Sequence, residues 1–224
     1  MSPAGPLRAT RGAPYAPAVR PDRRLPLVCL ALTLAGLVVT AIDPFDVPTW
    51  WLEVFPVLVA VPVLVATARR FPLTPLLYVL LTVHAAILMV GGHWSYARVP
   101  LGDWVRDAFH LARNPYDKLG HFAQGFVPAV LARELLLRTS PLQRGGWLFA
   151  IVTSMCLAVS ALYELLEWAT ALAFGGGAVE FLGTQGDPWD TQSDMFMALI
   201  GAITALATCS RMHDRQLGTM VERR

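Results

Sequence analysis

Long apolar stretches recur along this chain and constrain its fold more than any other feature. A helix needs about 20 apolar residues to cross the hydrocarbon core of a bilayer. Segments of roughly that length are expected at residues 25–42, 50–68, 72–91, 118–137, 147–173 and 191–210. Charged residues make up 15% of the chain, against about 25% in an ordinary soluble domain. The sequence therefore predicts an all-α, polytopic membrane helix bundle with about six transmembrane helices.

The two ends of the chain differ from this apolar middle. Residues 1–24 are rich in Pro, Arg, Ala and Gly without an apolar period, which predicts a flexible cytoplasmic tail. The first apolar run is too long for a signal-peptide core and lacks a clear cleavage site, so we expect it to be retained. Residues 25–210 are expected to form the membrane domain, and residues 211–224 a cytoplasmic C-terminal tail.

Arginine-rich segments alternate along the chain in a way that predicts orientation. Cytoplasmic loops carry an excess of Lys and Arg. With six spans, one side collects Arg20, Arg23, Arg24, Arg69, Arg70, Arg138, Arg144, Arg211, Arg215, Arg223 and Arg224. The opposite loops are acidic or mixed, including the long one at about residues 92–117. We therefore expect both termini inside and a multi-pass location in the bacterial cytoplasmic membrane.

Several functional classes find no support in the sequence. The net charge is only +2 and basic residues do not interleave with aromatic ones, so nucleic acid is not an expected partner. Cys29, Cys156 and Cys209 lie in or beside apolar runs, and none is part of a CxxC motif. They are expected to be buried hydrophobic residues instead of a disulfide set or a thiolate metal site. The chain also lacks GxSxG, HExxH and Walker motifs.

Ionisable residues gather near the outer ends of the expected spans. In "NPYDKLGHFAQGF", Asp117 and His121 are four residues apart and share a helix face. In "ALYELLEWATALAF", Glu164 and Glu167 are three apart in the outer half of their span. Asp194 lies one turn inside the last span. Charged groups in a bilayer are costly and mark function or pairing by default, so this convergence predicts a site.

Ordinary structural explanations exist for some of these residues. Asp117 suits a helix N-terminus, with Lys118 at the lipid headgroups. His121 can serve as a core histidine, and Asp190 as a solvated turn residue. The Glu164 and Glu167 pair is harder to explain this way, because two carboxylates on one apolar helix need protons, a cation or basic partners. At the inner end, Arg133 and Glu134 are expected to form an interfacial pair.

The residue types in this convergence fit two kinds of chemistry. Carboxylates suit Mg²⁺, Ca²⁺ or Mn²⁺, and a histidine among them also permits zinc or iron. Without a metal, a His–Glu pair can act as general acid and base. The expected catalytic and tentative metal-binding set is His121, Glu164, Glu167 and Asp194. The expected substrate-binding set is Lys118, Asp117, Asp190 and Tyr163.

Three long blocks carry a resemblance to a known family. They read "YDKLGHFAQGFVPAVLARELLLR", "ALYELLEWATAL" and "FLGTQGDPWDTQSDMFMALIGA". Together they resemble the YjdF-like bacterial inner-membrane proteins, which have no established activity. The resemblance covers about residues 40–210. It implies a multi-span helical protein of the cytoplasmic membrane and implies no substrate.

A looser resemblance joins short blocks of the chain to VanZ-like membrane proteins. The shared positions are Asp117, Lys118, His121, Phe122, Glu164, Asp194 and Gly201. Glu167 stands where that family has Gln, and Ala198 where it has Asn. These departures put in doubt the antibiotic-resistance role that the resemblance implies.

Three hypotheses of function follow. The preferred one is an outer-face acidic and histidine site that binds a divalent cation and acts on a lipid or lipid-linked molecule, with membrane lipids as the expected partners. The first alternative is a small ion- or proton-coupled transporter, although the inner half looks poor in polar groups. The second is a structural or partner-binding membrane protein without catalysis, which predicts near-normal behaviour after Glu164→Gln and Glu167→Gln. The sequence carries no signal for an oligomeric state.

Overall fold

The computed structural model of the protein describes residues 23–174 and 185–222, and all regular secondary structure within those ranges is helical. The helices are α1 (Arg24–Thr40), α2 (Val47–Thr67), α3 (Pro75–Trp94), α4 (Pro100–Phe109), α5 (Tyr116–Thr139), α6 (Gly146–Phe174) and α8 (Asp190–Glu222). The predicted all-α fold is therefore confirmed. Nearly all of the N-terminal segment expected to be a tail lies outside the described residues.

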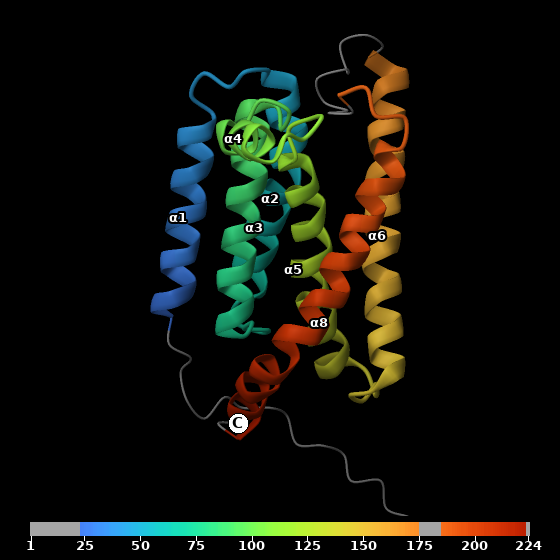
Figure 1. Cartoon of the computed structure of the whole chain (residues 1–224). Coiled ribbons are helices and arrows are strands. Elements are labelled where there is room, and N and C mark those ends of the chain that lie inside the picture. The colour runs from blue at the N-terminus through green and yellow to red at the C-terminus, as the bar shows by residue number, and fades with distance from the viewer. Residues whose placement is uncertain (1–22, 175–184, 223–224) are drawn as a thin grey trace, which may run out of the picture.

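Four of these helices are long and apolar enough to cross a membrane, namely α2, α3, α6 and α8. Helix α1 is apolar but has only 17 residues. Helix α5 has 24 residues and contains several charged ones. Figure 1 shows the start of α1 and the C-terminus at the same end of the bundle. A polytopic helical membrane protein is thus established, while the count of six spans stays a prediction.

Proline and capping residues set several helix starts. Asp46 precedes α2 and accepts a hydrogen bond from the backbone N–H of Thr49 at 2.8 Å. Pro75 and Pro100 occupy the first positions of α3 and α4, where the missing N–H of proline has no cost. These local signals explain why the predicted boundaries of the first five apolar segments agree with the helices to within a few residues.

Helix α8 extends well beyond the end predicted from its apolar run. The segment expected to begin a cytoplasmic tail at residue 211 instead continues the helix to Glu222. His213 and Leu217 lie buried within this extension. A count of apolar residues misses this continuation, because several residues after position 210 are polar. These polar residues find polar partners on α5, as Arg133 contacts both His213 and Asp214.

The match between α5 and α8 includes a buried polar group near the C-terminal end of the bundle. His213 lies between Arg133 and Glu134: its Nδ1 is 2.9 Å from Arg133 Nη1, and its Nε2 is 3.0 Å from Glu134 Oε2. All three side chains are buried. The expected interfacial pair of Arg133 and Glu134 is therefore wrong, since the two residues are linked through a histidine of α8 inside the bundle.

Helices α5 and α8 form the closest helix pair, and glycine permits it. A Cβ atom added to Gly125 would lie 1.8 Å from the carbonyl oxygen of Ala198, and one added to Gly201 would lie 2.1 Å from that of Phe122. Small residues at such crossings let the backbones of membrane helices approach closely. This contact fixes the register of α5 against α8, which decides which polar residues face one another at either end.

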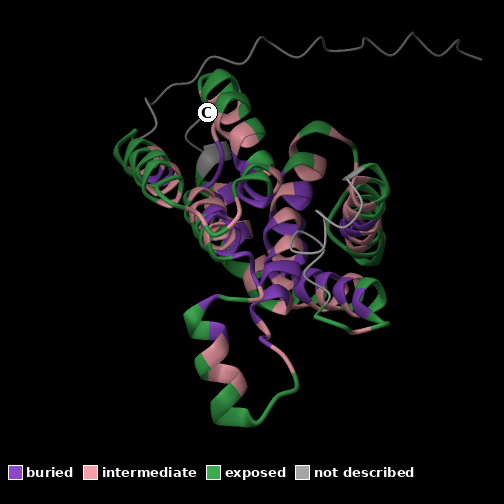
Figure 2. Cartoon of the chain, turned by 90° about the horizontal axis from the view of Figure 1, so that it is seen from above, coloured by how far each residue is buried: buried purple, intermediate pink, exposed green. Residues whose placement is uncertain are grey.

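Side-chain burial concentrates in the middle of the bundle (Figure 2). The largest buried cluster joins α3, α5, α6 and α8 and includes Leu77, Val130, Val152 and Ala202. Large apolar side chains cover the outward faces, for example Phe55 on α2 and Leu166 on α6. This inside-out pattern is the one expected for helices whose outer faces contact lipid.

Helix α4 lies within the segment that the sequence analysis treated as a loop. It projects away from the other helices at one end of the bundle, called here the α4 end (Figures 1 and 2). Asn114 anchors it, because its Nδ2 donates hydrogen bonds to Val99 O and Asp103 Oδ1, both at 3.0 Å. Gly102 leaves the space that the Asn114 side chain fills. The anchored segment leads directly into the start of α5.

Candidate functional site

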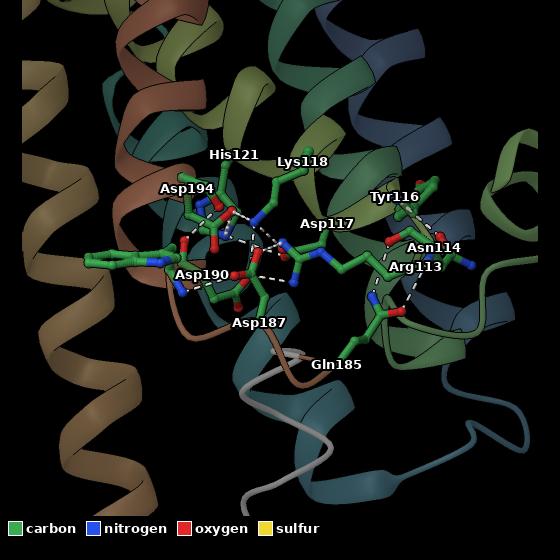
Figure 3. A network of polar contacts seen from close by, with 12 residues as sticks. Arg113, Asn114, Tyr116, Asp117, Lys118, His121, Gln185, Asp187, Asp190 and Asp194 are labelled. Atoms are coloured by element: carbon green, nitrogen blue, oxygen red, sulfur yellow. Dashed lines mark hydrogen bonds and ion pairs between the residues drawn. The ribbon is translucent and has the colours of Figure 1, made fainter. Parts of the chain in front are cut away.

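A polar group, called here the Lys118 cluster, lies at the α4 end where α5, α6 and α8 meet (Figure 3). Its members are Arg113, Asp117, Lys118, His121, Glu164, Asp187, Asp190 and Asp194. The ammonium of Lys118 points into the cluster. Its Nζ lies 2.5 Å from Asp194 Oδ1, 2.9 Å from Asp190 Oδ1 and 3.4 Å from Asp117 Oδ2. Lys118 therefore pairs with three carboxylates, and its role in binding a substrate stays a prediction.

Arg113 closes the cluster from the loop between α4 and α5. Its Nη1 lies 2.6 Å from Asp190 Oδ1, and its Nη2 lies 3.4 Å from Asp187 Oδ2. Burial opposes the charge of Arg113, but the hydrogen bond to Asp190 and its negative charge outweigh burial and hold the pKa of Arg113 above its ordinary value. Arg113 is therefore a permanent cation that ties the start of α8 to this loop.

His121 is surrounded by oxygen atoms. Its Nε2 lies 3.4 Å from Asp117 Oδ1 and 3.7 Å from Asp194 Oδ1. Its Nδ1 lies 2.9 Å from Gln124 Oε1 and 3.8 Å from Glu164 Oε1. A buried imidazole between carboxylates is suited to accepting and donating protons.

Three side chains of the cluster have the arrangement of metal ligands. Asp117, His121 and Asp194 each offer one ligand atom, and these atoms lie within 4.8 Å of one another. All three residues are buried. Two carboxylates and an imidazole suit Mn²⁺, Zn²⁺ or Fe²⁺.

Negative groups outnumber positive ones in the Lys118 cluster. Its five carboxylates meet two permanent cations, Lys118 and Arg113, and one histidine. Glu164 is 7% exposed, and its Oε1 has no hydrogen-bond partner in the described part of the chain. Buried carboxylates in such excess need protons or a further cation. The cluster is therefore built to take up positive charge.

A cavity of about 180 Å³ adjoins the cluster, between α2, α3, α5 and α6. Its polar lining consists of Glu53, His84, Tyr96, Asp117, His121, Gln124, Tyr163 and Glu167. Asp117 and His121 belong to both the cluster and the cavity. The imidazole that faces Asp194 therefore also lines the cavity.

Glu53 is a member of this site that the sequence analysis missed. It is 5% exposed, and its Oε2 accepts a hydrogen bond from the hydroxyl of Tyr163 at 3.3 Å. Tyr96 follows α3 and also contacts Glu53; burial and then the Glu53 charge raise the pKa of Tyr96 well above its ordinary value, so its hydroxyl stays protonated. A lone carboxylate in an apolar span was the signal that could have revealed Glu53.

The structure divides the predicted site residues between two adjoining places. The Lys118 cluster contains His121, Glu164, Asp194, Asp117, Lys118 and Asp190. Glu167 and Tyr163 line the cavity instead. Their predicted roles in catalysis and binding stay predictions, but the expected convergence of His121, Glu164 and Asp194 is present in the geometry.

Comparison with known proteins agrees with this architecture. A family model described as "Predicted membrane protein (DUF2238)" matches residues 25–215. The "Inner membrane protein YjdF" of Escherichia coli (strain K12) is 56% identical over 188 residues, which cover 84% of this chain and 90% of that protein. No solved structure matches the chain. The chain is therefore a multi-pass protein of the bacterial inner membrane and belongs to the DUF2238 family of predicted membrane proteins.

Proposed function

We propose that the protein binds a divalent cation in the Lys118 cluster and uses it to act on a lipid or lipid-linked molecule at the periplasmic face. The observation that carries this proposal is the convergence of Asp117, His121 and Asp194, from two helices, beside a cavity of about 180 Å³. The arginine bias of the loops at the other end of the bundle supports a periplasmic position for the α4 end.

The proposed chemistry assigns different tasks to the members of the cluster. Asp117, His121 and Asp194 would hold the cation, which would supply a Lewis acid for a phosphoryl or carbonyl oxygen or for a water molecule. His121 would hold the cation through Nε2, which faces Asp117 and Asp194, while its Nδ1–H donates to Gln124 Oε1 and fixes the tautomer that a ligand needs. Glu164, whose Oε1 lies 3.8 Å from His121 Nδ1, is the group that takes up a proton. Lys118 and Arg113 hold Asp190 and Asp194 in place before the cation arrives.

The metal content of the purified protein tests this proposal. Detergent-solubilised wild-type protein is equilibrated with Mn²⁺ or Zn²⁺, desalted and measured by atomic spectrometry. Stoichiometric metal is expected in the wild type, with a large loss in His121→Ala and in Asp194→Asn. Asp107→Asn is the control, because Asp107 is an exposed carboxylate on α4. Equal metal in wild type and both site variants, or none in the folded wild type, contradicts the proposal.

One observation favours an ion-coupled carrier as a second candidate. The C-terminal end of the α5–α8 pair carries its own buried polar group of Arg133, Glu134 and His213, so the inner half is less apolar than its sequence indicated. The close contact at Gly125 and Gly201 separates the two polar groups. Proton or cation flux into proteoliposomes distinguishes the candidates: a carrier gives flux that Glu134→Gln abolishes, whereas the proposed lipid-directed site gives none.

A further inference from the structure

Two cavities that differ in their ionisable side chains meet at His84. The polar cavity described above shares Pro56, His84 and Leu88 with a second cavity of about 290 Å³. The second cavity lies between α1, α2 and α3, and its lining is almost entirely apolar. A polar compartment that adjoins an apolar one is the shape required by a molecule with a headgroup and a chain.

His84 has an unsatisfied hydrogen-bonding atom at this junction. Its Nε2 is buried and has no hydrogen-bond partner in the described part of the chain. A buried polar atom without a partner is destabilising. A ligand that passes from one cavity to the other would place an oxygen atom, such as that of an ester linkage, beside this nitrogen.

The apolar cavity has the lining that an acyl chain requires. Leu30 of α1, Val61 and Leu64 of α2, and Leu81 of α3 contribute aliphatic surface to it. Moving an apolar chain from lipid into the cavity yields little hydrophobic free energy. The shape and length of the cavity therefore decide which chain it binds. His84 lines both cavities and lies where the apolar one adjoins the polar one.

The polar cavity carries two carboxyl groups, and neither a lysine nor an arginine of the described residues lines it. Glu53 belongs to α2 and Glu167 to α6, and neither forms an ion pair within the described residues. Tyr96 and Tyr163 provide hydroxyls and aromatic rings beside them. Lys118 is not part of the lining, because its ammonium is held among the carboxylates of its own cluster. Carboxylates and aromatic rings together favour an organic ammonium over an anion.

The volume of the polar cavity agrees with a small headgroup. It holds the equivalent of several water molecules, at about 30 Å³ each in the liquid. That is more space than a bare metal ion fills, and enough for an aminoalkyl group of a few non-hydrogen atoms.

We propose that these two cavities together bind one amphiphile whose headgroup carries an ammonium. The ammonium lies between Glu53 and Glu167, the linkage region contacts His84, and an acyl chain follows the apolar cavity between α1 and α3. This inference rests on the proposed function and names the substrate class of its site as an amine-bearing lipid. The linkage then passes His121, the residue shared with the Lys118 cluster.

Native mass spectrometry with two matched lipids tests the inference. The probes are phosphatidylethanolamine and phosphatidylethanol with identical chains, which differ by the ammonium alone. The wild type is expected to bind the amine-bearing lipid at least about tenfold more tightly, a difference of about 1.4 kcal/mol. Phosphorylethanolamine without chains is expected to bind far more weakly than either lipid, because the apolar cavity stays unfilled.

Three variants test whether the preference for the amine-bearing lipid arises in the polar cavity. Glu53→Gln keeps the size and the hydrogen-bond acceptor for Tyr163 but removes the charge, so the preference for the amine should disappear while folding is retained. His84→Leu should weaken both lipids by a similar factor and leave their ratio unchanged. Asp107→Asn, on exposed α4, should behave as the wild type.

The outcomes separate this inference from the proposed function. Equal binding of the two lipids by the wild type, or full selectivity in Glu53→Gln, overturns the amine-lipid inference. Glu53 is outside the cation-binding set, so Glu53→Gln should retain stoichiometric metal. A wild type that holds metal without amine selectivity overturns only the inference, and one with selectivity but no metal overturns only the cation site.

Discussion

Lys118 and Asp194 meet across the α5–α8 pair, with Lys118 Nζ 2.5 Å from Asp194 Oδ1. Asp194 is 2% exposed. The Lys118 ammonium also contacts Asp190 and Asp117, so a single cation joins carboxylates of two helices. This arrangement ties the start of α8 to the start of α5, and it places His121 within reach of the same oxygen of Asp194.

Removal of Lys118 alone should destabilise the bundle more than removal of Lys118 and neutralisation of Asp194 together. Breaking one side of a buried ion pair costs about 3–5 kcal/mol, because the remaining charge has no partner. Lys118→Met should lower the unfolding temperature in detergent, and Lys118→Met with Asp194→Asn should recover part of the loss. Thermal unfolding of the three proteins measures this. Additive losses in the double variant would show that the two side chains are not coupled.

The glycine contact between α5 and α8 should tolerate no side chain. Gly125→Ala and Gly201→Ala place a Cβ within 2.1 Å of a carbonyl oxygen, so the helices must separate, at a cost of about 1–3 kcal/mol or more. Gly218→Ala on the same α8 is the matched control, because a Cβ there meets nothing within 4 Å. It should be neutral or slightly stabilising. Thermal stability in detergent checks all three, and a stable Gly125→Ala protein would contradict the close contact.

His213 should be essential for stability although it lies far from the Lys118 cluster. Its Nδ1 faces an Arg133 donor, so this nitrogen accepts, and Nε2–H donates to Glu134. His213→Ala leaves Arg133 and Glu134 buried without this link, which should cost about 2–4 kcal/mol. His110→Asn, at the exposed residue directly after α4, is the control, because asparagine also tolerates the left-handed backbone there. If His213→Ala unfolds at the same temperature as the wild type and still binds metal, the His213 link does not contribute to the stability of the bundle.

The sequence predicted those helices whose length and apolar composition are imposed by the bilayer, and it did not predict the short helix α4. The long apolar runs give the helices of the bundle because bilayer thickness imposes their length. Helix α4 escaped because it has 10 residues and mixed polarity. Its apolar residues nevertheless recur at helical spacing through Leu101, Trp104, Val105 and Ala108.

The sequence predicted at which end of the bundle the site residues lie, but it did not predict which of them are in contact. Orientation and helix spacing brought His121, Glu164 and Asp194 to one end of the bundle. Distances depend on the register of α5 against α8, which the Gly125 and Gly201 contacts fix and which a single sequence does not state. Glu167 lies three residues after Glu164 on α6 and lines the cavity instead of joining the Lys118 cluster.

Helix α4 should lie in the plane of the lipid headgroups. Leu101, Trp104 and Phe109 are 58%, 66% and 70% exposed and share its apolar face. Asp103 and Asp107 lie on the other face with Arg106, which pairs with both. An amphipathic helix at the end of a transmembrane bundle, with a tryptophan on its apolar side, is typical of the membrane interface.

Spin labels can locate the two faces of α4 in a protein whose native cysteines are replaced by alanine. A label at Leu101→Cys should be relaxed mainly by oxygen, which concentrates in lipid, and one at Asp107→Cys mainly by a water-soluble nickel chelate. Asp107 is 69% exposed at its side chain, so its label has free access to solvent. The contrast between positions follows from helical spacing alone, because residues six apart fall on different faces. Chelate access at both positions would mean that α4 stands clear of the bilayer, and oxygen access at both would mean that it is immersed below the headgroups.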